Sequence, residues 1–307
     1  MAMANIPYRL GVIAPDEIKS RETSPLQRQW WDENYKRNLE RFKLHPPKGV
    51  KGNFEERFLN MPGFLVAAGP SLDKNMEHLK SIKGKCPIFA VDGALPPLLK
   101  AGIRPDFVIS IEGDAEVGWF WEDLDTKGLI LICSTVSSPD ALETWHGDIY
   151  FSNAWISDTG EYDFGKLWSG GNVSTVMMSF AVGMCFTNPT IFVGHDFSFK
   201  EREPGFYFPK NGAPVMEEQV NRIIYNSREM TDINGEKVYT TPDLFHACNW
   251  TEQAMLKIYH LEQDYTFFVN ATEGGILGAN LNSPRPVERL GLSAAIDKYC
   301  KLQLGRI

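Results

Sequence analysis

Residues that can bind a nucleotide or move a proton recur directly after the apolar runs of this chain. They are Gly69-Pro70-Ser71, Asp92, Glu112 with Asp114, His195 with Asp196, and Asn270 with Glu273. Buried parallel strands read as continuous apolar runs, and their carboxyl ends meet at one edge of a sheet. We therefore expect these groups to gather at that edge. Carboxylates that lie close together can hold a divalent cation, bind ribose hydroxyls or share a proton.

Two glycine-containing turns are candidate phosphate sites. Gly69-Pro70-Ser71 follows the apolar run 64–68 and opens a predicted helix, since Gly69 can turn sharply and Pro70 suits the first helical position. Gly170-Gly171-Asn172 precedes a second predicted helix, which extends through residue 185. Backbone amides at the start of a helix bind anions. The alternative is that Gly69-Pro70-Ser71 is only a well-formed turn.

The other polar groups also have structural explanations. Asp92 could cap the next helix, Glu112 could pair with Arg104, and Asn270 could fix a turn. These explanations are independent of one another, whereas a single ligand site accounts for all the groups at once. The pattern therefore favours a functional edge of the sheet.

Apolar runs alternate with stretches of helical length from residue 64 onward. Strands are predicted at 64–68, 86–91, 106–111, 129–133, 148–151, 189–193 and 267–269, and helices at 53–60, 94–101, 250–263 and 292–304. This alternation is typical of an α/β fold: a Rossmann-like, doubly wound and mostly parallel sheet with helices on both faces.

The chain is expected to divide into three parts. These are an N-terminal arm and helix over 1–54, the Rossmann-like domain over 55–285, and a C-terminal helix over 286–307. Residues 198–245 are polar and rich in Gly, Pro and Tyr, which predicts an insertion or lid. The arm helix begins near Ser24 and carries an aromatic and leucine stripe at helical spacing, which would pack on the sheet domain or on a second copy of the chain.

Composition narrows the class of protein. The net charge of −8 over 307 residues argues against a general nucleic-acid or anionic-membrane binder. The sequence has no apolar signal core and no segment of membrane-spanning length. The 5 cysteines are scattered singly, which favours buried thiols in a reducing compartment, and we expect a cytoplasmic protein. The motifs GxxxxGK[ST], GxGxxG, HExxH and GxSxG are all missing.

Several segments, taken in order, resemble one family. They are 66–75 (VAAGPSLDKN), 88–94 (IFAVDGA), 101–108 (AGIRPDFV), 170–173 (GGNV), 193–199 (VGHDFSF), 232–235 (DING) with 238–242 (VYTTP), and 270–275 (NATEGG). Over roughly residues 60–280 the chain resembles the motility-associated factor (Maf) glycosyltransferases and their MptE-like relatives. The segments at 232–242 and 270–275 favour the Maf branch.

The resemblance implies a Rossmann-like domain related to bacterial sialyltransferases. In the Maf branch it implies transfer of a nonulosonic acid, such as pseudaminic or legionaminic acid, from its CMP-activated form to a hydroxyl of flagellin. In the MptE branch it implies transfer of diphosphate from ATP to 6-hydroxymethyl-dihydropterin with magnesium. We therefore expect a transferase for a nucleotide-activated small molecule, with a protein or glycan acceptor. A catalytically silent nucleotide-binding module is the third alternative.

This chain departs from the family pattern at two points. Many relatives carry Gln where this chain has His195, and full Maf proteins have large flanking domains for flagellin where this chain has a short arm and tail. The departures concern the acceptor more than the donor chemistry.

Either branch assigns roles to the polar residues. The expected nucleotide and phosphate contacts are Gly69, Pro70, Ser71, Asp92, Gly170, Gly171, Asn172, Asn270 and Glu273, with Asp92 on ribose. His195, Asp196 or Glu112 would accept the proton of the acceptor hydroxyl, and only one of the two adjacent residues His195 and Asp196 is expected to face the ligand. The residues themselves assign no cofactor. In the kinase branch, magnesium would be held by Glu112, Asp114 and Asp196.

Overall fold

The computed structural model describes residues 25–154, 162–200, 225–261, 266–279 and 287–300. Within these ranges one sheet has nine strands in the order β1-β6-β5-β4-β3-β2-β7-β10-β11, and every pairing in it is parallel. The strands are β1 (Lys48–Gly49), β2 (Gly63–Val66), β3 (Ile88–Val91), β4 (Phe107–Ile109), β5 (Ile130–Ser134), β6 (Asp148–Ser152), β7 (Thr190–Val193), β10 (Phe268–Asn270) and β11 (Val287–Arg289). The predicted parallel α/β fold is confirmed.

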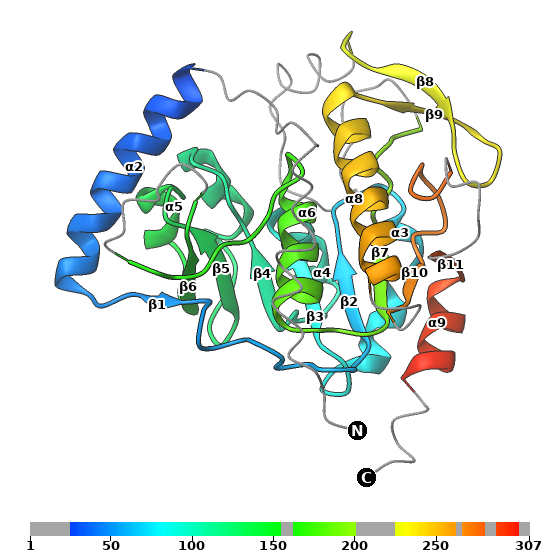
Figure 1. Cartoon of the computed structure of the whole chain (residues 1–307), viewed down its shortest axis with the longest axis horizontal. Coiled ribbons are helices and arrows are strands. Elements are labelled where there is room, and N and C mark those ends of the chain that lie inside the picture. The colour runs from blue at the N-terminus through cyan, green and yellow to red at the C-terminus, as the bar shows by residue number, and fades with distance from the viewer. Residues whose placement is uncertain (1–24, 155–161, 201–224, 262–265, 280–286, 301–307) are drawn as a thin grey trace.

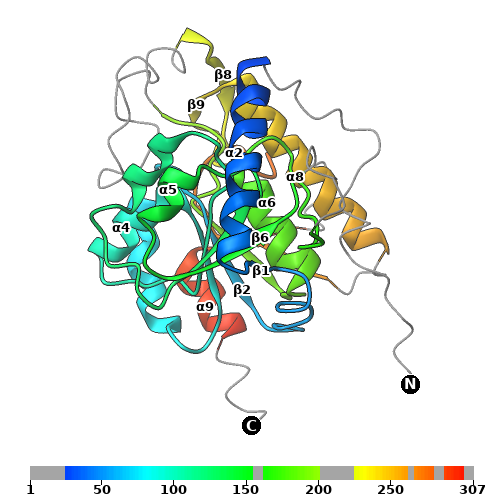
Figure 2. The same ribbon diagram turned by 90° about the vertical axis from the view of Figure 1, so that its left-hand side faces the viewer.

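Helices cover both faces of the sheet (Figures 1 and 2). They are α2 (Pro25–Leu44), α3 (Leu72–Asn75), α4 (Leu95–Lys100), α5 (Pro139–Glu143), α6 (Val173–Met178), α8 (Pro242–Leu261) and α9 (Leu292–Tyr299). Short 3-10 segments lie at Met76–Ile82, Asp92–Ala94 and Ala115–Phe120, and α6 continues with π geometry over Ser179–Met184. Figure 2 places α6 and α8 on the face opposite to α4, α5 and α9. Right-handed crossovers require this, because the chain first winds one way across the sheet and then the other.

The core is aromatic on the face covered by α6. Phe89 of β3 and Phe107 of β4 stack with ring centroids 5.1 Å apart, and Phe180 meets Phe107 edge-on at 5.4 Å. Phe54 adds a further edge contact with Phe107 at 5.4 Å. This apolar filling leaves polar side chains at the strand ends.

Residues 53–60 form a series of turns and not the predicted helix. Phe54 and Phe58, four residues apart, gave the helical spacing. Both rings enter the aromatic core, but the amides of Glu56, Phe58 and Asn60 donate to the carbonyls of residues 184–186. Tertiary hydrogen bonds thus replace those of a helix.

Other boundaries differ from expectation. α8 begins at Pro242, inside the predicted 198–245 insertion, whose described part also holds the antiparallel hairpin β8 (Arg228–Thr231) and β9 (Lys237–Thr240). Residues 201–224 lie outside the described ranges. The edge strands β1 and β11 lie outside the predicted 55–285 range.

The residues that α2 buries against the domain differ from those of the predicted aromatic and leucine stripe. Trp30 is 39 % exposed, whereas Asn34, Asn38 and Phe42 are buried. Leu26 lies where side chains are not described. Figure 1 shows α2 lying along the β5–β6 end of the sheet, next to α5. Assembly of two copies through this helix stays a prediction.

Candidate functional site

The candidate site lies at the carboxyl edge of the sheet, where β2 and β7 are neighbours. From β2 the chain winds outward to β3, β4, β5 and β6, and from β7 it winds the other way to β10 and β11. In an open α/β sheet, ligands bind in the crevice outside the strand ends at such a switch point. Along this edge the turns after β4, β3, β2, β7 and β10 follow one another.

A carboxylate from the turn after β7 closes the turn after β2. The Ser71 hydroxyl donates to Asp196 Oδ2 at 2.7 Å, and the Ser71 amide donates to the same oxygen at 3.3 Å. The Gly69 amide donates to the Gly194 carbonyl at 2.9 Å. The amides of Gly69 and Ser71, expected to face a phosphate, are therefore already engaged. The anion at this turn is the protein's own carboxylate.

Asp196 is buried, and its protonation reflects this. Desolvation raises the pKa of its carboxyl to about 6, although the hydrogen bonds from Ser71 and the charge of Lys74 oppose the rise. Ser71 occupies the N-cap position of α3 but makes no capping hydrogen bond with its side chain. Its hydroxyl donates to Asp196 instead.

Lys74 brings a cation to the same turn. Its side chain is exposed, and its charge acts on both Asp196 and Glu236. A Cβ added to Gly274 would lie 3.8 Å from the Lys74 amine and 3.7 Å from Asp196 Oδ1, so the loop after β10 faces both groups. No carboxylate of the described ranges forms an ion pair with Lys74. This lysine is available to bind an anion.

The hairpin β8–β9 borders the switch point on the β10 side. Its turn docks on the loop after β10, where the Ile233 amide donates to the Gly275 carbonyl at 2.9 Å. Lys200, which follows β7, pairs with Glu236 of the hairpin, and the hydrogen bond from this pair raises the pKa of Lys200. The predicted insertion therefore contributes a wall to the site.

A second polar cluster follows β3 and β4. The carboxylate of buried Asp92 accepts hydrogen bonds from the Gly93 amide at 2.7 Å and from the Ser110 hydroxyl. Desolvation raises the pKa of Asp92 to about 6 despite these bonds. Desolvation, followed by the charges of Asp92 and Asp114, raises the pKa of Glu112 to about 7. A carboxyl group that titrates near neutral pH is suited to give or take a proton.

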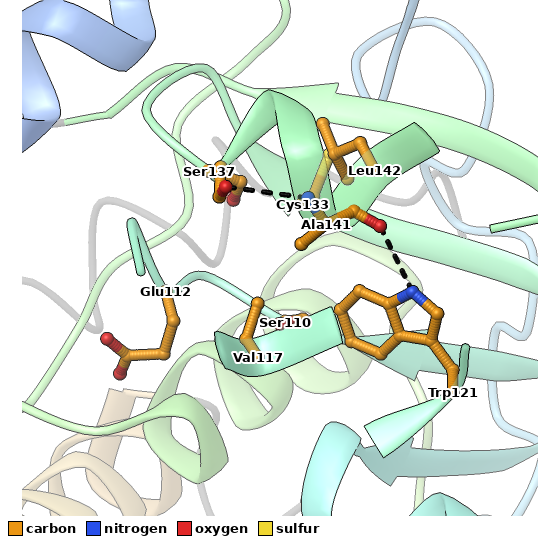
Figure 3. Close-up of a pocket in the computed structure, with 9 residues that line it drawn as sticks. Ser110, Glu112, Val117, Trp121, Cys133, Ser137, Ala141 and Leu142 are labelled. Atoms are coloured by element: carbon orange, nitrogen blue, oxygen red, sulfur yellow. Dashed lines mark hydrogen bonds between the residues drawn. The ribbon is translucent and has the colours of Figure 1, made fainter. Parts of the chain in front are cut away.

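Glu112 reaches solvent in one direction only. Its side chain is exposed, and Figure 3 shows its carboxylate pointing away from Trp121, Cys133 and Leu142. The gap lined by these residues does not admit a water molecule. The suggested partner of Glu112, Arg104, instead donates to the carbonyls of Asp125 and Lys127, at 3.1 and 2.6 Å.

His195 lies apart from these carboxylates. Its Nδ1 is 3.2 Å from the Val193 carbonyl, which makes Nδ1 the donor, and its ring lies edge-on to Phe192 at 4.9 Å. Burial lowers the pKa of His195 to about 4, so the ring is neutral at neutral pH. Its Nε2 is buried with no hydrogen-bond partner among the described residues. As expected for adjacent residues, His195 and Asp196 point to different surroundings, and Asp196 is the one that meets the turn after β2.

The residues after β10 bind the protein itself. The Asn270 side chain donates to the Leu277 carbonyl at 2.9 Å and accepts from the Thr272 amide at 3.0 Å. Glu273 accepts from the Asn75 side chain at 3.1 Å and from the Leu292 amide at 2.9 Å. The contacts of Asn270 are therefore those of a residue that fixes a turn, as the structural alternative suggested. The contacts of Glu273 join α3 to α9. A nucleotide contact for either residue stays a prediction.

The Gly170-Gly171-Asn172 segment opens α6. Asn172 caps the helix by accepting from the Thr175 amide at 3.1 Å, and the Gly170 amide donates to the Thr175 hydroxyl at 2.8 Å. A Cβ on Gly170 would collide with the ring of Trp250 in α8, so helix packing accounts for this glycine. Since α6 packs on β3 and β4, its first turn lies at the same edge as Asp92 and Glu112.

The predicted magnesium ligands do not form a metal site in the structure. Asp196 accepts from Ser71, Asp114 accepts from the Glu116 amide at 3.0 Å, and Glu112 lies beside Asp92. In the part of the chain that the structure describes, no three His, Cys, Asp or Glu side chains are close enough to hold a metal ion. Within the same ranges, no helix is long and apolar enough to cross a membrane.

An open groove of about 650 Å³ lies at the other edge of the sheet. It is lined by Pro96, Leu99, Lys100, Gly102, Arg104, Asp123, Leu124 and Asp125. Arg104 and Asp125 precede β4 and β5, so this groove is remote from the strand ends that carry the polar clusters.

Comparison with known proteins identifies the family. A family model described as 6-hydroxymethylpterin diphosphokinase MptE-like matches residues 33–202. The chain belongs to this MptE-like family. An uncharacterized protein of Treponema pallidum (strain Nichols) is 34% identical over 82 residues, which are 27% of this chain and 37% of that protein. The resemblance inferred from the sequence motifs is confirmed at the family level.

A solved structure shares the fold of this MptE-like protein. The MAf glycosyltransferase from Magnetospirillum magneticum AMB-1 superimposes with a TM-score of 0.57 at 18% identity, covering 87% of this chain and 39% of that one. The chain therefore spans less than half the length of each of these two proteins. At this identity the likeness establishes a common fold.

Sequence reasoning missed several residues of this MptE-like site. Lys74 lies within the GPSLDKN segment but received no role, and Ser110, which bonds Asp92, ends an apolar run. His246 of α8 lies near Gly171, and its Nε2 is buried without a partner in the described ranges. For Asn34 and Asn38 the available signal was two asparagines four residues apart in a helix, where asparagine is unfavourable.

Asp92 should make the stability of the protein depend on pH. Its pKa is about 6 in the folded state against 3.8 for a free aspartate carboxyl, so the folded state binds the proton more tightly, and this stabilisation is lost as the pH rises through about 6. Asp92→Asn keeps an oxygen for Gly93 and Ser110 but cannot titrate. In urea unfolding, we expect the free energy of unfolding of the variant relative to that of the wild type to increase by about 1 kcal/mol from about pH 5 to about pH 7.5. An equal pH dependence for both proteins would show that Asp92 is ionised at low pH.

Proposed function

We propose that this protein is a transferase that moves an activated group from a nucleotide donor to a hydroxyl acceptor at the carboxyl edge of the sheet. The observation that carries the proposal is the arrangement of the exposed Lys74 at the switch point and a carboxyl pair, Asp92 and Glu112, at the next strand ends. The family and the shared fold support the same class of chemistry.

The preferred donor is a CMP-activated nonulosonic sugar. Such a donor carries a phosphate and a carboxylate, and an exposed lysine binds either anion. The hydroxyl oxygen of the acceptor would form a bond to the anomeric carbon while the bond from that carbon to the phosphate oxygen breaks. Glu112 would take the hydroxyl proton, and CMP would leave as an anion that needs little acid assistance. The fold shared with a Maf glycosyltransferase and the segments 232–242 and 270–275 favour this donor.

The second candidate is an ATP-dependent 6-hydroxymethyl-dihydropterin diphosphokinase, which the name of the matching family favours. This reaction also needs a base for a hydroxyl group, so Glu112 would keep its role. Its magnesium would have to be held by residues that the described ranges do not gather in advance.

Calorimetric titration separates the two donors and tests Lys74 at the same time. We expect CMP or CDP to bind and Lys74→Gln to weaken binding by about 10-fold or more, the usual cost of a lost charged hydrogen bond. Lys80→Gln is the matched control, because Lys80 belongs to the same segment but pairs with Glu77. Tight ATP binding that requires magnesium, with no binding of cytidine nucleotides, would instead establish the diphosphokinase. Equal affinities of Lys74→Gln and Lys80→Gln would remove Lys74 from the site.

A further inference from the structure

The helix α2 holds the carboxyl edge of the sheet through two buried asparagines. The Asn34 side chain donates to the Gly113 carbonyl at 2.7 Å and to the Val136 carbonyl at 3.1 Å. The Asn38 side chain donates to the carbonyls of Thr135 and Ser137, both at 2.9 Å. Asn34 therefore joins the loop after β4 to the loop after β5, whereas Asn38 holds only the latter.

The contact of α2 with Gly113 is close. A Cβ on Gly113 would lie 2.5 Å from Cδ1 of Trp31 and 3.3 Å from the Asn34 side-chain nitrogen. Gly113 directly follows Glu112, and the Glu112 carbonyl accepts from the Ser138 amide at 3.2 Å. The backbone of residues 112–113 is thus fixed from α2 on one side and from the start of α5 on the other.

We infer that Asn34 is a positioning residue for Glu112, with Trp31 as its support. The inference depends on the proposed role of Glu112. The Asn34 amide fixes the Gly113 carbonyl and so the direction in which the Glu112 side chain leaves the backbone. A reacting carboxylate that moves by about 1 Å loses much of its effect on rate, so an anchor one residue away controls catalysis without touching the substrate.

The matched variants are Asn34→Ala and Asn38→Ala. Both remove a buried asparagine from the same helix face together with two hydrogen bonds to backbone carbonyls, so the losses of stability should be similar. Only Asn34→Ala releases the loop that carries Glu112. Hydrogen exchange measured by mass spectrometry should show about 10-fold faster exchange or more at residues 112–116 in Asn34→Ala and unchanged exchange there in Asn38→Ala.

Measurements of kcat and Kd test whether Asn34 positions Glu112 for the reaction or only anchors the loop. We expect Asn34→Ala to lower the kcat of transfer about 10-fold with the Kd for the donor within about 2-fold of wild type, and Asn38→Ala to change neither. If Asn34→Ala does not fold, Trp31→Leu provides a second test. It replaces a half-buried side chain, and we expect the same faster exchange at residues 112–116.

The outcomes distinguish this inference from the proposed function. Equal exchange at 112–116 in both asparagine variants, or unchanged exchange in Trp31→Leu, would overturn the inference whatever reaction the protein performs. Faster exchange with an unchanged kcat would also overturn it, because the loop would then not control the reaction. If no donor supports transfer in the wild type, the proposed function fails, and a positioning role for Asn34 fails with it even though the exchange result stands.

Discussion

Replacing Glu112 with glutamine is expected to lower the rate of group transfer by about 10²-fold or more, the usual contribution of a general base. Glutamine keeps the size of the side chain but cannot accept the proton of the acceptor hydroxyl. Because we propose that donor anions bind at Lys74 and not at Glu112, the affinity for the donor should change little. The expected signature is therefore a loss in kcat with an unchanged Kd for the nucleotide.

The pH profile identifies the group further. Glu112 acts as a base only when ionised, and its pKa is about 7, so the wild-type rate should rise with pH through that value. The rise should be missing in Glu112→Gln. Glu122→Gln, at an exposed glutamate, is the matched control and should behave as wild type. Asp92→Asn should move the rise to lower pH, because the Asp92 charge helps to raise the pKa of Glu112.

His195 provides the competing explanation. If it were the base, His195→Asn would cause the large loss and Glu112→Gln a small one. The structure favours Glu112, because the His195 ring is buried against Phe192 and its pKa is lowered to about 4. A large loss of transfer in His195→Asn, with the fold and the donor affinity intact, would return the role to His195.

The strands of this fold were predictable because burial on both faces leaves a simple signal. Residues 64–68, 88–91 and 191–193 are continuous apolar runs, and each overlaps a central strand. Lys48–Gly49 and Val287–Arg289 lie at the edges of the sheet, where a strand needs no apolar run. Neither edge strand was predicted.

The position of the site was also predictable, but its contacts were not. Asp92, Glu112 and Asp196 follow apolar runs, which places them at one edge. Which of them meet depends on the order of the strands across the sheet. The contact between Ser71 and Asp196 exists because β7 returns to lie beside β2, and no spacing in the sequence encodes that neighbour.

The role of α2 shows a second limit. Helical periodicity located the helix correctly, and its large aromatic residues suggested an apolar contact face. The buried face carries Asn34 and Asn38, which meet backbone carbonyls of two loops, as well as Phe42, which packs on the rings of Phe151 and Phe164. Apolar periodicity detects only contacts made by apolar side chains, so it does not detect the contacts that the asparagines make.

Gly69→Ala is expected to destabilise the protein strongly. The added Cβ would overlap the carboxylate of Asp196 and the backbone carbonyl of Gly194, and both are fixed: the first by Ser71, the second by the Gly69 amide. Neither can move without breaking the contact between β2 and β7. We expect a loss of about 3 kcal/mol or more in the free energy of unfolding, at the upper end of the cost of overpacking.

Urea unfolding of matched glycine variants measures this loss. Gly274→Ala adds a methyl group to the same cluster, but its Cβ would meet Asp196, Lys74 and Ser71 at ordinary contact distances of 3.7–3.9 Å, so we expect a change below about 1 kcal/mol. A similar small change in Gly69→Ala would show that Asp196 can leave the turn at little cost, and that the turn is then open to a phosphate group. A large loss in Gly69→Ala alone would show that the Asp196 carboxylate is a fixed part of the turn, which is then closed to a phosphate group.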